Sequence, residues 1–146
     1  MSKENKVSNS DFILKIPTQS TNLKIIRDFI TDIAVKAGFD KSASCDIALA
    51  VDEACTNVIK HAYRGGDDKE ITVKVRYDSD KIVISISDTG KGFKSEPEDE
   101  VAIQKRLKKL QRGGLGIYLM KKAMDEVVFD RDAESMNSVK MTKYLD

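Results

Sequence analysis

The sequence feature that most limits the possible folds is a pair of glycine clusters separated by a charged segment. The first lies in Asp88-Thr89-Gly90-Lys91-Gly92-Phe93, and the second is Gly113-Gly114-Leu115-Gly116. Glycine lacks Cβ, so both clusters suit places where the backbone comes close to another group. The second cluster runs directly into an apolar-periodic segment, Leu115 to Val127, which predicts a helix. Because free N–H groups at a helix start attract anions, the pattern predicts a nucleotide site.

Length and composition fit one globular domain. The chain has 146 residues, of which 40% are hydrophobic and 34% are charged. A net charge of +1 gives no support for nucleic-acid binding through a basic surface. No stretch approaches the ~20 apolar residues of a membrane span, and the N-terminus has no signal-peptide core. We expect a cytoplasmic protein, with residues 1–10 disordered and one domain over residues 11–146.

Periodicity predicts two strand pairs with helices between them. Residues 11–16 alternate as a strand that Pro17 ends, and apolar residues then recur at helical spacing up to a capping Gly38. A second helix is expected from about Asp40 to Tyr63. Strands are expected over residues 70–77, 82–87, 126–131 and 138–145. This order predicts an α+β two-layer sandwich, with a mixed, mostly antiparallel sheet and helices on one face, rather than a doubly wound sheet.

The helix of residues 40–63 carries the chain's two cysteines and its single histidine. Cys45 and Cys55 are ten residues apart, which is ~15 Å along a helix. A disulfide needs Cα atoms within ~7 Å, so we expect two reduced, buried thiols. For His61 a packing role is favoured, and no zinc-type spacing is present.

Two acidic positions stand out because of where the predicted elements place them. Glu53 and Asn57 form an i, i+4 pair at one margin of the second helix's apolar face. They either project into a shared pocket or are ordinary boundary residues. Period two carries Asp88 onto the inner face of its strand, where a carboxylate is costly unless it is paired. It either caps the Gly90 turn or binds the donor groups of a ligand.

The segment from Glu96 to Arg112 is acidic at its start and basic at its end. That distribution matches a helix dipole, so a short exposed helix is plausible from the sequence. Charge of this kind usually marks a solvated face. Its position between the two glycine clusters favours a lid over the nucleotide site.

Three motifs in fixed order resemble a known family. Glu53 to Asn57, Asp88 to Phe93 and Gly113 to Gly116 are similar to the N box and the two glycine boxes of the GHKL superfamily ATP-binding domain, which includes gyrase and histidine kinases. The run Glu-Ala-x-x-Asn-x-x-x-His-Ala-Tyr, from Glu53 to Tyr63, further resembles the bacterial anti-sigma factor serine kinases. The resemblance covers residues 11–145.

The resemblance implies a role for each matched residue. Asn57 would offer its amide oxygen to a Mg²⁺ that bridges the ATP phosphates, and Glu53 would be the general base. Asp88 would accept a hydrogen bond from the adenine amino group. The other ATP-contacting positions would be Gly90, Gly92, Phe93, Arg112, Gly113, Gly114, Leu115 and Gly116.

The resemblance also implies a function and partners. We expect a kinase that phosphorylates a serine of an anti-anti-sigma (STAS) protein and sequesters a sigma factor, and that forms a homodimer. Direct nucleic-acid or membrane binding is not expected. One alternative is a nucleotide-dependent binding switch with little or no kinase activity. Another is a phosphotransfer partner in a STAS-linked pathway with a different output.

Overall fold

The computed structural model describes residues 10–62, 70–88, 115–131 and 137–146. The elements are β1 (Ser10–Pro17), the 3-10 turn η1 (Ser20–Asn22), α2 (Leu23–Ala37), α3 (Lys41–Ala62), β2 (Glu70–Tyr77), β3 (Lys81–Asp88), α5 (Leu115–Ala123), β4 (Glu126–Arg131) and β5 (Asn137–Tyr144). Residues 1–9 of the start predicted to be disordered, the turn at 65–68, the segment from Glu96 to Arg112 and the connection at 132–136 lie outside the described residues. Ser10, the last residue of that predicted start, belongs to β1 instead.

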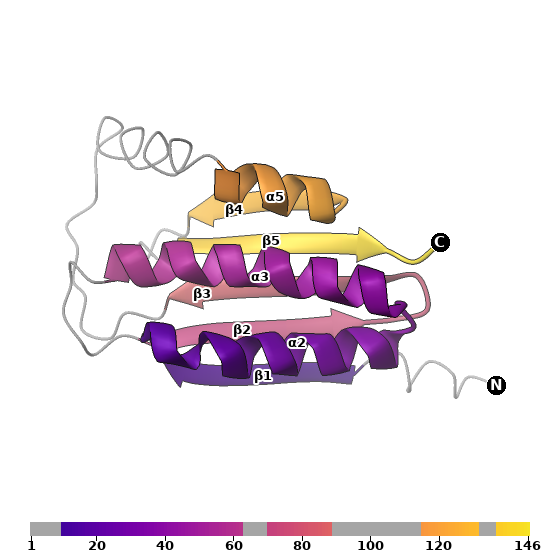
Figure 1. Cartoon of the computed structure of the whole chain (residues 1–146), viewed down its shortest axis with the longest axis horizontal. Helices are drawn as coiled ribbons and strands as arrows, with labels where there is room; N and C mark the ends of the chain where they lie inside the picture. The colour runs from indigo at the N-terminus through magenta and orange to yellow at the C-terminus, as the bar shows by residue number, and fades with distance from the viewer. Residues whose placement is uncertain (1–9, 63–69, 89–114, 132–136) are drawn as a thin grey trace.

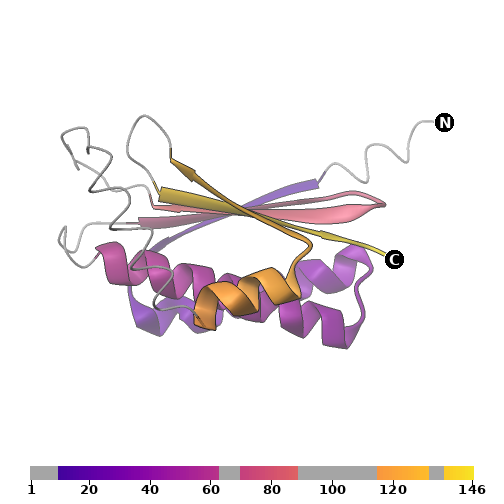
Figure 2. The same cartoon turned by 90° about the horizontal axis from the view of Figure 1, so that it is seen from above.

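Five strands form one sheet in the order β1-β2-β3-β5-β4. Every pairing among the described strands is antiparallel. Helices α2, α3 and α5 all lie on one face of this sheet, with α3 between the other two (Figures 1 and 2). The prediction of an α+β two-layer sandwich with helices on one face is confirmed, and the sheet is more uniformly antiparallel than the predicted mixed arrangement.

The core lies between the sheet and the helix layer because each element presents one apolar face. In β3 the residues Ile82, Ile84 and Ile86 alternate inward and are fully buried. Their neighbours across the sheet are buried too, since register places Val73 opposite Ile86 and Met141 opposite Ile84. Alternate side chains of a strand point to opposite faces, so the same period sends the polar residues outward.

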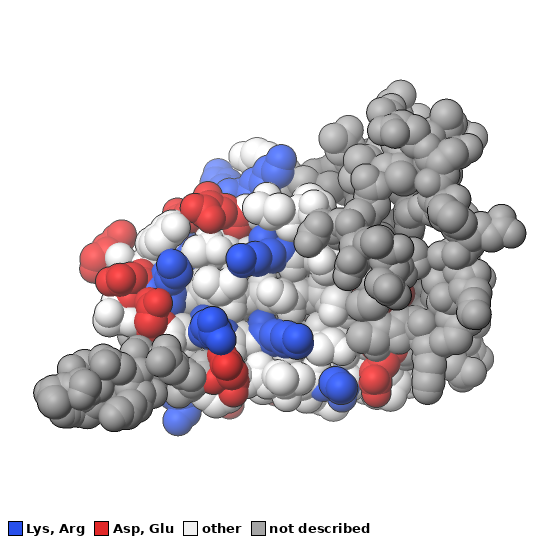
Figure 3. Space-filling model, turned by 180° about the vertical axis from the view of Figure 1, so that it is seen from behind, with Lys and Arg blue, Asp and Glu red and all other residues white. Residues whose placement is uncertain are grey.

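None of the described helices lies on the outward face of the sheet, and lysine and arginine side chains are spread over its centre (Figure 3). Lys15, Lys74 and Lys140 are exposed there. Arg76 lies opposite Asp11 in the β1–β2 register, and its Nε donates to Asp11 Oδ1 at 2.8 Å. An antiparallel sheet tolerates water on one face, so this side needs no further covering layer.

Helix α5 ends earlier than the sequence suggested. The apolar period predicted a helix up to Val127, but α5 ends at Ala123 and Val127 belongs to β4, opposite Met141. The N–H of Asp125 donates to the carbonyl of Thr142 at 2.8 Å, which draws the chain into the sheet. Val127 still packs against the core, which is why its apolar character matched both a helix and a strand.

Gly38 lies between α2 and α3, and the importance of its backbone conformation can be tested by substitution. It ends α2 in a left-handed conformation, with φ of 111°, and its N–H donates to the carbonyl of Val35 at 3.0 Å. A Cβ at this position would be 3.6 Å from Leu145, an ordinary contact, so backbone strain decides the effect. We predict that Gly38→Ala lowers the free energy of unfolding in urea by about 1–2 kcal/mol.

The matched variant is Gly38→Asn, because asparagine tolerates the left-handed region better than alanine. It should lose less stability than Gly38→Ala. Equal losses for the two variants would contradict the assignment of the effect to backbone conformation.

Candidate nucleotide and phosphoryl-transfer site

The elements that carry the three sequence motifs lie close together in the sandwich. Helix α3 and strand β3 run in the same direction, and α5 packs against α3, starting beside its middle and running the opposite way (Figure 1). β3 ends at Asp88, and α5 begins at Leu115. The fold therefore brings the N-box helix, the strand before the first glycine box and the helix after the second box together.

Helix α3 presents Glu53 and Asn57 beside its buried face. Ile47, Val51 and Ala54 point into the core and are nearly or fully inaccessible. Glu53 and Asn57 are half-buried, one turn apart. Within the described residues neither side chain makes a hydrogen bond or ion pair.

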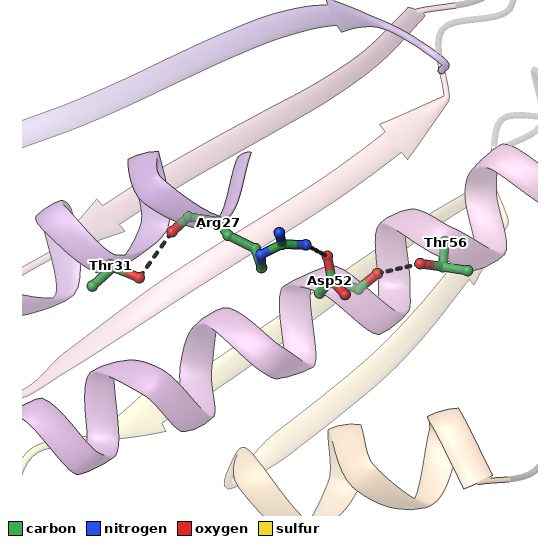
Figure 4. A network of polar contacts seen from close by, with 4 residues as sticks. All are labelled: Arg27, Thr31, Asp52 and Thr56. Carbon is green, nitrogen blue, oxygen red and sulfur yellow. Dashed lines mark hydrogen bonds and ion pairs between the residues drawn. The ribbon is translucent and has the colours of Figure 1, made fainter. Parts of the chain in front are cut away.

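The neighbour of Glu53 on α3 shows which way the pair faces. Asp52 points toward α2, because its Oδ1 accepts a hydrogen bond from Arg27 Nη1 at 2.9 Å (Figure 4). Successive helix residues are turned by about 100°, so Glu53 is turned away from α2. Asn57 follows one turn later. The pair therefore faces the α5 side of α3.

Asp88 is the last residue of β3 and lies on the inner face, as the alternation predicted. It is 8% exposed and opposite Ile71 in the β2–β3 register. A carboxylate at this depth needs polar partners, since transfer of a charge into an apolar environment is costly. The Gly90 turn, which Asp88 would cap in the structural interpretation, lies outside the described residues.

The glycine boxes are only partly within the described chain. Gly90, Gly92, Phe93, Arg112, Gly113 and Gly114 lie outside it. Leu115 and Gly116 form the first turn of α5, which begins where the sequence predicted. The backbone of His61 lies in α3, and its side chain is outside the described part.

Sequence reasoning missed the polar network that joins α2 to α3. Besides the Arg27–Asp52 ion pair, the hydroxyl of Thr56 donates to the carbonyl of Asp52, and that of Thr31 donates to the carbonyl of Arg27, both at 2.8 Å (Figure 4). Arg27 and Asp52 are 25 residues apart, so spacing alone gave no signal for their pairing. Half-exposed ion pairs of this kind contribute about 0–1 kcal/mol.

Comparison with known proteins identifies the family. Residues 16–143 match the histidine kinase-like ATPase domain. The chain belongs to this family. The match covers most of the chain, and the family prediction made from the three motifs is confirmed.

Curated relatives of this ATPase-domain protein are serine-protein kinases. The chain is 37% identical to Serine-protein kinase RsbW of Bacillus pumilus over 138 residues, which covers 90% of this chain and 84% of the relative. It is 32% identical to the protein of that name from Bacillus subtilis, covering 94% and 88% of the two chains. The relative from Listeria monocytogenes serotype 4a is 36% identical, with 90% and 85% covered. The prediction of a protein serine kinase is therefore confirmed at the level of the family.

The donor set of this ATPase domain fits a cation held mostly by phosphate. Among the described residues, no three His, Cys, Asp or Glu side chains gather at one point. Asn57 would supply one amide oxygen, and Mg²⁺ typically takes one or two protein ligands while keeping water and substrate phosphates. In the same part of the chain, no helix combines the length and apolar character needed to cross a membrane.

The two cysteines of α3 differ more than the sequence predicted. Cys55 is buried as expected, but Cys45 is exposed, because it lies on the outward side of the helix. Burial is the main cause that raises the pKa of the Cys55 thiol to about 12, and the nearby negative charge of Asp52 adds to it. A raised pKa keeps the thiol protonated and unreactive at pH 8.

We therefore predict that an aromatic disulfide reagent at pH 8 modifies one thiol per folded chain. Cys45→Ser should abolish this reaction, and unfolding in urea should expose the second thiol. Rapid modification of two thiols in the folded protein would contradict the burial of Cys55.

Proposed function

We propose that this protein is an anti-sigma factor serine kinase, which transfers the γ-phosphate of ATP to a serine of a STAS-type protein. The observation that supports the proposal is the arrangement of the elements that carry these residues: α3 holds Glu53 and Asn57, β3 beneath it ends at Asp88, and α5 packs against α3. Its support is alignment over about nine-tenths of the chain with serine-protein kinases. A sigma factor is the expected second partner, in a cytoplasmic homodimer.

Glu53 is the proposed general base. Its carboxylate is half-buried on the α5 side of α3 and has no ion-pair or hydrogen-bond partner within the described residues. The acceptor serine loses its proton to this carboxylate as its oxygen bonds to the γ-phosphorus. The bond between that phosphorus and the oxygen of the departing ADP breaks in the same exchange. General-base assistance of this type contributes about 10²–10⁴-fold in rate.

Asn57 and Asp88 are proposed to hold the nucleotide. Asn57 lies one turn beyond Glu53 and offers an amide oxygen to Mg²⁺, which when bound neutralises phosphate charge. Asp88, at the buried end of β3, accepts the adenine amino group. The first turn of α5, at Leu115 and Gly116, directs free N–H groups toward the phosphates. Gly90, Gly92, Phe93, Arg112, Gly113 and Gly114 complete the proposed nucleotide contacts.

The test is a Glu53→Gln variant, which keeps the size of the side chain and removes its basicity. We predict at least ~10²-fold slower transfer of phosphate to a purified STAS-type protein, with unchanged ATP affinity. Transfer is measured with γ-labelled ATP, and affinity by calorimetry. The matched control is Asp52→Asn, the adjacent carboxylate that faces α2, which should retain the rate within a few-fold.

Two results would contradict this assignment. A wild-type rate in Glu53→Gln would remove Glu53 as the base. Wild-type protein that binds ATP and its STAS partner, yet transfers no phosphate, would instead indicate a nucleotide-dependent binding switch.

A further inference from the structure

One side of α3 carries a leucine, the proposed base and the proposed metal ligand in series. Leu49, Glu53 and Asn57 follow one another at four-residue spacing, so each is ~6 Å along the helix axis from the next. Side chains four residues apart also differ in direction by about 40° around the helix axis. Leu49 is therefore displaced from Glu53 toward α2, whereas Asn57 is displaced toward α5.

Phosphoryl transfer sets the direction from which the acceptor must come. The attacking and leaving oxygens lie roughly in line on opposite sides of the phosphorus. If Asn57 and the start of α5 hold the nucleotide, the phosphate approaches Glu53 from that side. The acceptor oxygen must then reach Glu53 from the opposite side, which is the side of Leu49 and α2.

Two exposed apolar side chains lie on that side. Leu49 is 43% exposed, whereas the other large aliphatic residues of α3 within the described chain are buried. Thr31 and Val35 follow Arg27 on α2 at four-residue spacing. Because α2 runs antiparallel to α3, these two residues lie beside turns of α3 that precede Asp52 (Figures 1 and 4). Val35 is 55% exposed. We name Thr31, Val35 and Leu49 the acceptor ridge.

Four charged side chains beside the acceptor ridge pair with one another. Arg27 bonds Asp52 at 2.9 Å, and Lys24 bonds Asp28 on α2 at the same distance. These four charges cancel, but Asp32 on α2 and Asp46 on α3 are exposed as well. The rim is therefore mixed in character, and Leu49 and Val35 are the part of it that an apolar side chain of a partner can cover. Single exposed apolar residues are ordinary on protein surfaces, but here two of them lie where the acceptor must pass.

We propose that the acceptor ridge docks the phosphoacceptor protein, and that Leu49 contacts an apolar side chain next to the serine that is phosphorylated. This inference rests on the proposed kinase function and specifies how that site selects its protein substrate. Leu49 acts here in substrate binding, without part in the proton transfer.

The test separates docking from chemistry through steady-state kinetics with a purified STAS-type protein as acceptor. Leu49→Ala should raise the KM for the acceptor about tenfold, which corresponds to the loss of roughly two buried methylene equivalents. The kcat at saturating acceptor and the KM for ATP should stay unchanged. Leu49→Met should restore the acceptor KM to near the wild-type value, since methionine has similar volume.

The matched control is Val128→Ala. Val128 is 55% exposed, like the residues of the ridge, but lies on the helix-free face of the sheet. It should leave the acceptor KM unchanged. An unchanged KM in Leu49→Ala, or an equal rise in Val128→Ala, would overturn the proposal.

Three further outcomes would also overturn it, each in a recognisable way. A fall in kcat at constant KM would place Leu49 in the chemistry. A shift from dimer to monomer in sedimentation, with acceptor KM unchanged in the variant, would make the ridge a contact between two copies of this chain. Absence of transfer by the wild type would remove the proposed function and the docking inference together.

Discussion

Burial of one face of α3 against the sheet is the constraint on which the rest of the site depends. Ile47, Val51 and Ala54 are held in the core, and a buried aliphatic side chain contributes ~1.5–3 kcal/mol. The Arg27–Asp52 ion pair contributes about 0–1 kcal/mol. Packing therefore fixes the rotation of α3 about its axis, and with it the direction of Glu53 and Asn57. The ion pair adds little to an orientation that packing of the core has already set.

In the proposed function, the same core would give the nucleotide and the acceptor separate sides of one helix. The buried period of β3 ends on Asp88, so a strand with three fully buried isoleucines also supplies the proposed adenine contact. Helix α5 packs against one side of α3, and α2 packs against the other. The proposed base between them would receive a proton from a protein serine that arrives over α2 while phosphate is held on the side of α5.

Hydrophobic periodicity predicted the fold well, because the burial of apolar side chains determines both the sequence pattern and the arrangement of the elements. The alternation of residues 70–77 matched β2, and Gly38 ends α2 in the left-handed conformation that its place predicted. The helix of Leu115 was predicted too long, because Val127 packs on the core from a strand as readily as from a helix. Cys45 was expected to be buried, but a small residue at the margin of a helix face gives no reliable period. The motif order identified the family, whereas contacts across 25 residues, such as Arg27 to Asp52, leave no trace in local spacing.

The most direct measurement of the central claim is calorimetry of ATP binding to wild type and Asp88→Asn, each with and without Mg²⁺. Asparagine keeps the shape of the side chain but weakens acceptance from the adenine amino group. The account predicts micromolar-range binding by the wild type, strengthened by Mg²⁺, and at least ~10-fold weaker binding by Asp88→Asn. Failure of the wild type to bind ATP in Mg²⁺ would contradict the account, and equal affinity of the two proteins would remove Asp88 from the site.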